Sequence, residues 1–126
     1  MLRGDVTQFD DVMAVTATTK PSRILNLSYF LGDHPPHFAT KLNIIGMDNC
    51  FEAARLCGVN RVVYASSLAV SGQQKHFGDR AVTEDDLQYG DYQYAQHKRF
   101  NEFQAEDYNR KYGMTITGVR PANVTG

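Results

Sequence analysis

The sequence predicts a single α/β domain in which a parallel sheet of about three strands is flanked by helices. Short apolar segments alternate along the chain with segments of helical periodicity, and this alternation favours a parallel sheet. The chain has 126 residues, which is enough for one small domain. Its apolar fraction of 42% and charged fraction of 21% are ordinary for a globular protein, so a disordered or collagen-like chain is excluded.

The first half of the chain has the pattern of a helix, a strand and a second helix. The first helix is expected to end near Thr19, because Pro21 cannot continue it. Residues 22–29 are apolar and bounded by turns, which indicates a buried strand. Residues 39–56 carry apolar side chains at helical spacing, and Gly58 is suited to cap the end of that helix.

The second half predicts a strand, a long loop, a helix and a last strand. Residues 61–65 form the strand, and the polar stretch 71–90 follows it. A loop of about twenty residues inside a compact domain is uncommon and usually functional. Residues 92–112 are expected to be helical and 114–119 to be the last strand. The apolar residues expected on that helix are Tyr94, Phe100, Phe103 and Tyr108.

Charge and composition exclude several classes of protein. Thirteen Lys and Arg residues against fourteen Asp and Glu give a formal charge of −1, without the basic excess of a duplex-binding or polybasic membrane-surface protein. No apolar run approaches the roughly 20 residues that cross a bilayer, and the first residues lack the apolar stretch of a signal peptide, so we expect a cytoplasmic protein. Cys50 and Cys57 are expected to be small core residues in a reducing compartment. The four scattered histidines predict no metal site.

Candidate chemical groups gather where the predicted strands end. Right-handed crossovers place the strands side by side, and ligands of such sheets bind at the carboxyl ends. Tyr94 and Lys98 share a helix face, so a phenol and an ammonium can reach one ligand. Ser67 follows a strand and can meet them at that edge. Taken alone, the Tyr–Lys pair is more often part of a plain surface helix, and Ser67 is more often a plain strand-to-loop serine.

Four segments occur together in an order that resembles a known family. They are residues 64–72 (YASSLAVSG), residues 83–85 (TED), Tyr94 with Lys98 and Glu102 at four-residue spacing, and residues 120–126 (RPANVTG). The sequence thereby resembles, over essentially its whole length, the extended short-chain dehydrogenase/reductases. These are the NAD-dependent epimerase/dehydratase proteins that include UDP-galactose 4-epimerase.

The resemblance implies a partial NAD(P)-binding Rossmann-like domain over residues 1–126, with NAD or NADP as cofactor and a nucleotide sugar or a related hydroxyl or carbonyl compound as substrate. It assigns Ser67 as the catalytic serine, Tyr94 as the acid/base and Lys98 as the lysine that holds the nicotinamide ribose. The cofactor-binding residues that it implies are Asp5, Val6, Leu27, Ser28, Tyr29, Asn43, Ala65, Tyr94, Lys98, Pro121, Asn123 and Val124. Outside the resemblance, Asp5 is a plain turn residue, Asn43 an exposed helix residue and Asn123 a loop residue.

The sequence also departs from the family. It contains no glycine-rich GxxGxxG or GxGxxG turn, which binds the cofactor pyrophosphate, and His97 replaces the small residue usual before the lysine. The resemblance therefore implies a domain truncated at both ends, without the glycine-rich part and the C-terminal substrate lobe. Two hypotheses follow: an NAD(P)-dependent oxidoreductase, epimerase or dehydratase, or a catalytically incompetent fragment acting at most as a binding or assembly module. We also expect a homo-oligomer, formed through the helices at 39–58 and 92–112 or through an exposed strand at 22–29.

Overall fold

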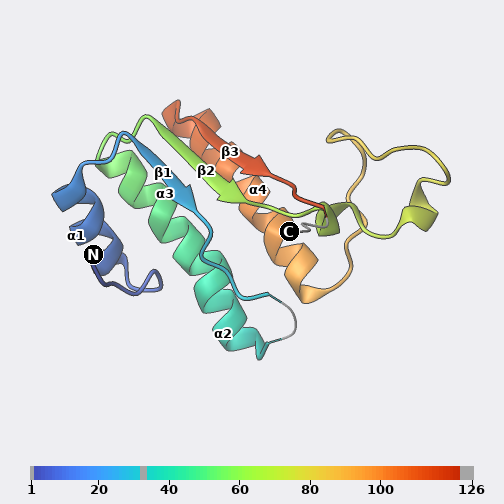
Figure 1. Cartoon of the computed structure of the whole chain (residues 1–126), viewed down its shortest axis with the longest axis horizontal. Helices are drawn as coiled ribbons and strands as arrows, with labels where there is room; N and C mark the ends of the chain where they lie inside the picture. The colour runs from blue at the N-terminus through green and yellow to red at the C-terminus, as the bar shows by residue number, and fades with distance from the viewer. Residues whose placement is uncertain (1, 32–33, 123–126) are drawn as a thin grey trace.

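The computed structural model describes residues 2–31 and 34–122 and forms a three-stranded sheet with helices packed against it (Figure 1). The elements in chain order are α1 (Phe9–Thr19), β1 (Arg23–Asn26), α2 (Pro36–Thr40), η1 (Lys41–Gly46), α3 (Met47–Leu56), β2 (Arg61–Ala65), η2 (Leu68–Ser71), η3 (Gln74–His76), α4 (Gln93–Tyr112) and β3 (Ile116–Val119).

The three strands lie in the order β1-β2-β3 and all pairs are parallel, which confirms the predicted sheet. In this register Leu25 lies opposite Val63, and Val63 lies opposite Thr117. All three carboxyl ends therefore point toward one edge of the molecule, where the segment after β2 and the start of α4 meet (Figure 1).

The hydrophobic core lies between the sheet and the helices α3 and α4. Alternate strand residues point into it, because successive side chains of a strand face opposite sides. Val62 and Tyr64 of β2 pack there with Phe51 of α3, whose ring meets the Tyr64 ring edge-on, with centroids 5.4 Å apart. Ile116 of β3 and Ala105 of α4 complete the same cluster.

The other face of the sheet carries exposed apolar side chains. Leu25 is 65% exposed although it belongs to a strand, and Val63 and Thr117 lie in register beside it. Parallel sheets usually have both faces covered. In the described part of the chain α3 and α4 cover one face only (Figure 1).

Several predicted boundaries differ from those of the structure. The strand expected at 22–29 is limited to Arg23–Asn26, because the chain then turns through hydrogen bonds such as that from the Ser28 amide to the Asn26 side chain, 2.9 Å. The helix expected from residue 39 already begins at Pro36, and its second turn is the π-helical segment η1.

Within the part of the chain that the structure describes, no helix is long and apolar enough to cross a membrane.

The four apolar residues expected on α4 differ in burial, and Tyr108 is the one that packs against the core. Phe100 and Phe103 are exposed, whereas the buried residues of this helix are Ala95, Lys98, Asn101 and Ala105. Small side chains let the helix lie close to the strand ends. This close approach explains how a lysine and an asparagine of α4 reach backbone carbonyl groups. Of the two cysteines, Cys50 is buried as expected and Cys57 is half-buried.

Candidate active site

Lys98 lies at the centre of the predicted site, and its side chain is 1% exposed. Its ammonium donates a hydrogen bond to the carbonyl oxygen of Ala65, the last residue of β2. The same nitrogen lies 3.3 Å from the centroid of the Tyr29 ring and 5.5 Å from that of the Tyr94 ring. Burial lowers the pKa of Lys98 to about 8. We call Tyr29, Ala65, Tyr94 and Lys98 the Lys98 cluster.

Tyr94 joins this cluster from the first turn of α4. Its ring meets the Tyr29 ring edge-on, with centroids 5.6 Å apart and an interplanar angle of 87°. On its other side it stacks on Tyr92, with centroids 6.2 Å apart. The phenol is half-buried, and the nearby ammonium of Lys98 is a group that stabilises a phenolate. The structure thus brings together two of the predicted catalytic residues.

The two serines after β2 have different partners. Ser67 is half-buried, and its hydroxyl oxygen accepts a hydrogen bond of 3.1 Å from the Ala69 amide, which caps the start of η2. Ser66 is buried and donates its hydroxyl to Glu102 at 2.5 Å. Ser67 therefore lies two residues after Ala65, whose carbonyl accepts the hydrogen bond from Lys98. The backbone before it is fixed by the Ser66–Glu102 hydrogen bond, and the Ala69 amide fixes its own hydroxyl.

A second group of polar side chains, the Glu102 cluster, consists of Ser66, Gln88, Glu102 and Arg120. The Glu102 carboxylate accepts two hydrogen bonds of 2.7 Å from Arg120 and one of 2.8 Å from Gln88. Burial alone raises the pKa of Glu102, but the hydrogen bonds from Arg120 and Ser66 outweigh it and leave that pKa below its usual value. This cluster ties α4 to the ends of β2 and β3 and to the long loop.

Sequence reasoning did not find the Glu102 cluster as a structural unit. The sequence analysis named Glu102 and Arg120 only as motif residues of the family resemblance and did not predict that their side chains meet. The available pattern was the spacing itself: Tyr94, Lys98 and Glu102 are four residues apart, which places all three on one helix face.

Asn43 is buried, with 2% of its surface exposed, so it is not the exposed helix residue of the simpler interpretation. Its side-chain oxygen accepts a 2.8 Å hydrogen bond from the Phe30 amide, and its side-chain nitrogen lies 3.4 Å from the His97 ring nitrogen Nδ1. Its backbone carbonyl accepts a 2.9 Å hydrogen bond from Asn101 of α4. Asn43 therefore fixes the segment after β1, which carries Tyr29, relative to α4.

Three of the predicted cofactor-binding residues lie beside a cavity of about 320 Å³ between α1 and β1. Asp5, Val6 and Ser28 all line it. The Asp5 carboxylate accepts a 2.8 Å hydrogen bond from the Thr7 amide, and this hydrogen bond lowers its pKa. The Val6 carbonyl is held by a 2.9 Å hydrogen bond from Asn49.

Two of the remaining predicted cofactor residues, Leu27 and Pro121, follow the strands β1 and β3 along the chain. Leu27 is 65% exposed and does not line that cavity. Pro121 accepts a 3.2 Å hydrogen bond from the Leu68 amide, so the segment after β3 is tied to η2. Asn123 and Val124 lie outside the described residues.

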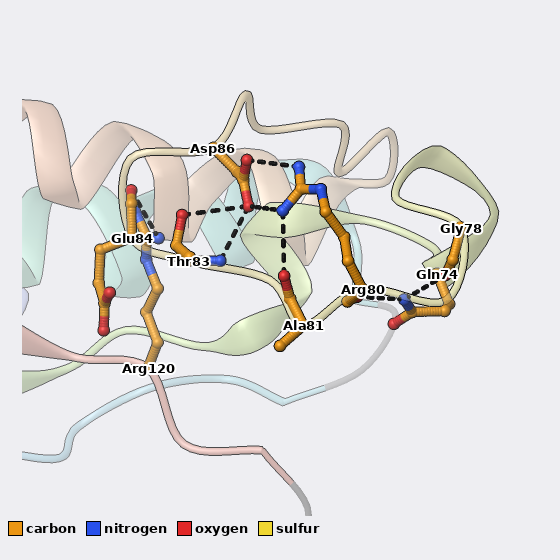
Figure 2. Close-up of polar contacts among 8 residues, drawn as sticks. All are labelled: Gln74, Gly78, Arg80, Ala81, Thr83, Glu84, Asp86 and Arg120. Atoms are coloured by element: carbon orange, nitrogen blue, oxygen red, sulfur yellow. Dashed lines mark hydrogen bonds and ion pairs between the residues drawn. The ribbon is translucent and has the colours of Figure 1, made fainter.

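The long loop after η2 is ordered by its own hydrogen bonds (Figure 2). Arg80 donates to both carboxylate oxygens of Asp86, at 2.6 and 2.8 Å, and Asp86 also accepts from the Thr83 amide. The hydrogen bonds from Arg80 hold the pKa of Asp86 well below its usual range. Arg120 reaches the loop as well, donating to the Glu84 carbonyl at 3.3 Å, so the loop is connected to the Glu102 cluster (Figure 2).

These observations bear on whether the residues fit a dinucleotide. The cavity beside Asp5 offers space and a carboxylate at the adenosine end. At the other end, the hydroxyl of Tyr29 is buried without a hydrogen-bond partner in the described part of the chain, next to the ammonium of Lys98. An orphaned hydroxyl and a buried ammonium at the strand ends suit a ligand that carries hydroxyl groups. The carboxylate beside the cavity and the buried ammonium thus fit the adenosine and ribose parts of such a cofactor.

Comparisons with known proteins agree with the sequence resemblance. The sequence pattern of the NAD dependent epimerase/dehydratase family matches residues 1–126. Protein CapI of Staphylococcus aureus is 30% identical over 125 residues, which are 94% of this chain and 36% of that protein. UDP-glucose 4-epimerase of Mycolicibacterium smegmatis is 31% identical over 122 residues, covering 92% of this chain and 38% of that protein.

The fold agrees as well. UDP-glucose 4-epimerase from Brucella ovis, solved in complex with NAD, superposes with a TM-score of 0.88 at 21% identity, covering 98% of this chain and 38% of that one. At this identity the likeness concerns the fold. The chain spans 36% and 38% of the length of the two sequence relatives.

Proposed function

Because the chain belongs to the NAD dependent epimerase/dehydratase family, we propose that Tyr94, Lys98 and Ser67 are the proton-transfer residues of an NAD(P)-dependent site. The substrate class is a nucleotide sugar or a related hydroxyl or carbonyl compound. The name of one sequence relative supports this class, since the Mycolicibacterium smegmatis protein that is 31% identical is a UDP-glucose 4-epimerase. The reaction type is oxidation at a carbon that bears a hydroxyl, as a step of epimerisation, dehydration or net oxidoreduction.

In this proposal each residue acts on a stated atom. Tyr94 takes the proton of the substrate hydroxyl as the carbonyl forms, and Ser67 holds the same oxygen by a hydrogen bond. Lys98 supplies positive charge beside the phenol and donates hydrogen bonds to ribose hydroxyls. Asp5, Val6 and Ser28 line the cavity for the adenosine end. The nicotinamide, when bound, supplies the capacity to accept and return a hydride.

One observation carries the proposal: the ammonium of Lys98 touches the end of β2 and lies 5.5 Å from the Tyr94 ring centroid. An isolated surface helix would leave both side chains in water. Here the lysine is buried at the carboxyl edge of a parallel sheet, which is where such sheets bind ligands.

Calorimetric titration with NAD and with NADP tests the proposal. Saturable binding is expected for the wild type and for Tyr94→Phe, because the phenol transfers a proton and is not needed for affinity. Turnover of UDP-glucose or another nucleotide sugar is expected to be lost in Tyr94→Phe. Chromatography of the sugar nucleotides detects epimerisation or dehydration, which leave no net reduced nicotinamide, and the absorbance of reduced nicotinamide detects net oxidation. Tyr92→Phe is the matched control, since Tyr92 stacks on Tyr94 without contacting Lys98 in the cluster. Equal turnover in both variants would contradict the role of Tyr94.

The second candidate is a cofactor-independent binding or assembly module. It is the alternative to the enzyme, and the same titrations with NAD and NADP distinguish the two. Failure of NAD and NADP to bind at any concentration tested would support this candidate.

We further propose that the chain self-associates, through the edge of β1 or through the helices. Leu25 and Leu27 are exposed at or after β1, and Phe100 and Phe103 are exposed on α4. An exposed strand edge readily pairs with another chain. Light scattering of Leu25→Lys and of Phe103→Lys distinguishes the two surfaces, since only the variant in the true interface becomes monomeric. A wild-type chain that is monomeric at tens of micromolar, an order of magnitude suited to weak interfaces, would refute self-association.

A further inference from the structure

Tyr29 covers the ammonium of Lys98 with the face of its ring. The nitrogen lies 3.3 Å from the ring centroid, closer than to the ring of Tyr94, and its hydrogen-bond acceptor is the Ala65 carbonyl. In the described residues no carboxylate pairs with Lys98. The cation is therefore satisfied by one carbonyl and by aromatic faces, and the ring excludes water from it.

The hydroxyl of Tyr29 does not hold the ring in this position. It is buried, and among the described residues it has no hydrogen-bond partner. Burial raises the pKa of Tyr29 far above its usual value, so the phenol is neutral. A buried hydroxyl without a partner disfavours the position that it occupies. The ring is held by its contacts with Lys98 and with the edge of Tyr94.

The backbone on both sides of Tyr29 is fixed. The Ser28 amide donates to the Asn26 side chain at 2.9 Å, and the Phe30 amide donates to Asn43 at 2.8 Å. Tyr29 itself lies beyond the end of β1, outside regular structure. Its side chain can thus rotate without breaking a hydrogen bond of the sheet.

We propose that Tyr29 is a displaceable cap on Lys98, whose ring must rotate away before the hydroxyl groups of a ribose or sugar reach the ammonium. The identity of the ligand rests on the proposed function, whereas the cap itself rests on the contacts of this chain. Ligand hydroxyls would replace the ring as partners of the cation, and the freed phenol would exchange an unpaired, buried state for a solvated one.

Reductive methylation of lysines with formaldehyde and cyanoborohydride, read by mass spectrometry at neutral pH, tests the cap without any cofactor. In the wild type Lys98 is expected to react far more slowly than the exposed Lys20 and Lys75. Tyr29→Ala is expected to speed the labelling of Lys98 about tenfold, the change that loss of a desolvated cation–π contact predicts. Tyr29→Phe, the matched control, keeps the ring and removes the unpartnered hydroxyl, so Lys98 is expected to be labelled no faster than in the wild type.

Unchanged labelling in Tyr29→Ala would overturn the cap, and so would a Tyr29→Phe rate equal to that of Tyr29→Ala. A measurement on the wild type does not depend on the folding of a variant: the ring face should shift the proton resonances of the Lys98 ε-methylene upfield, and unshifted resonances would also overturn the cap. Faster labelling in Tyr29→Ala supports the cap even if no variant binds NAD or NADP, a result that would instead contradict the proposed function.

Discussion

Replacing Glu102 by glutamine tests whether the Glu102 cluster holds the strand ends together. The carboxylate accepts four hydrogen bonds, from Ser66, Gln88 and twice from Arg120. Glutamine keeps the size of the side chain but removes the charge and replaces one acceptor oxygen by a donor. The new NH₂ group then lies against donors, because Ser66, Gln88 and Arg120 all donate to the carboxylate in the wild type.

The magnitude follows from burial and charge. Glu102 and Arg120 side chains are 20% and 19% exposed. A hydrogen bond to a charged group contributes about 1.5–3 kcal/mol, whereas an exposed ion pair contributes about 0.2–1 kcal/mol. For a pair that is mostly buried and bidentate, we expect Glu102→Gln to lower the free energy of unfolding by about 2–3 kcal/mol. Glu52→Gln is the matched control, because its partner Arg55 is more exposed, and it should cost less than about 1 kcal/mol.

The effect has a defined pH dependence. The pKa of Glu102 is lower in the folded chain than its ordinary value of 4.5, so the folded state binds fewer protons than the unfolded state as pH falls. The stabilisation is therefore present above about pH 4.5 and is lost as pH falls through the folded pKa. Urea unfolding followed by circular dichroism should show a difference between wild type and Glu102→Gln at neutral pH that shrinks in acid. A loss no larger than that of Glu52→Gln, or a difference independent of pH, would refute this account.

Three further substitutions have expected results. Gly90→Ala should destabilise by about 1–3 kcal/mol in urea unfolding, because an added Cβ would lie 2.6 Å from both the Ala69 carbonyl oxygen and the Ala95 Cβ; full stability would contradict the close approach of the loop to α4. Phe51→Ala should cost about 3–5 kcal/mol in the same assay, because the ring is fully buried; a loss below about 1 kcal/mol would show that the core is not packed as described. Lys98 has a pKa of about 8 in the folded chain, below its ordinary value of 10.5. Between these two pH values the unfolded state binds more protons, so the free energy of unfolding of the wild type rises with pH. Lys98→Met should abolish this rise. Parallel pH profiles of wild type and Lys98→Met would contradict the burial of the ammonium.

Much of the fold could be predicted from sequence because its elements have strong local patterns. The strand at Arg61–Ala65 was predicted with its observed bounds, and Gly113 ends α4 in the left-handed conformation that favours glycine. The π-helical turn at η1 was not predicted, because it has no simple periodicity. Its asparagine, Asn43, is held by contacts with Phe30 and Asn101 that are distant in sequence.

For the candidate site, the sequence predicts only which residues share a helix face and not which groups their side chains contact. Spacing places Tyr94 and Lys98 on one face of α4, but it does not state which carbonyl the lysine reaches or which ring covers it. Phe100 and Phe103 are two of the four apolar residues expected on this helix, yet both are exposed. The residues that this helix buries are instead Ala95, Lys98, Asn101 and Ala105, which have no apolar periodicity for a sequence pattern to detect.

Lys98 and Glu102 lie on successive turns of the same face of α4, and they form hydrogen bonds with adjacent residues at the end of β2. Lys98 binds the carbonyl of Ala65, and Glu102 binds the hydroxyl of Ser66. The peptide that joins these two residues is thus fixed on both sides by one helix. Ser67 follows this peptide directly, and its hydroxyl oxygen accepts a hydrogen bond from the Ala69 amide. A hydroxyl that must meet a substrate oxygen together with Tyr94 requires such a fixed origin, because a small displacement of a reacting group sharply lowers the rate. In the proposed function the Glu102 cluster is therefore a positioning group for the strand end, while the residues proposed to touch substrate and cofactor are those of the Lys98 cluster and Ser67.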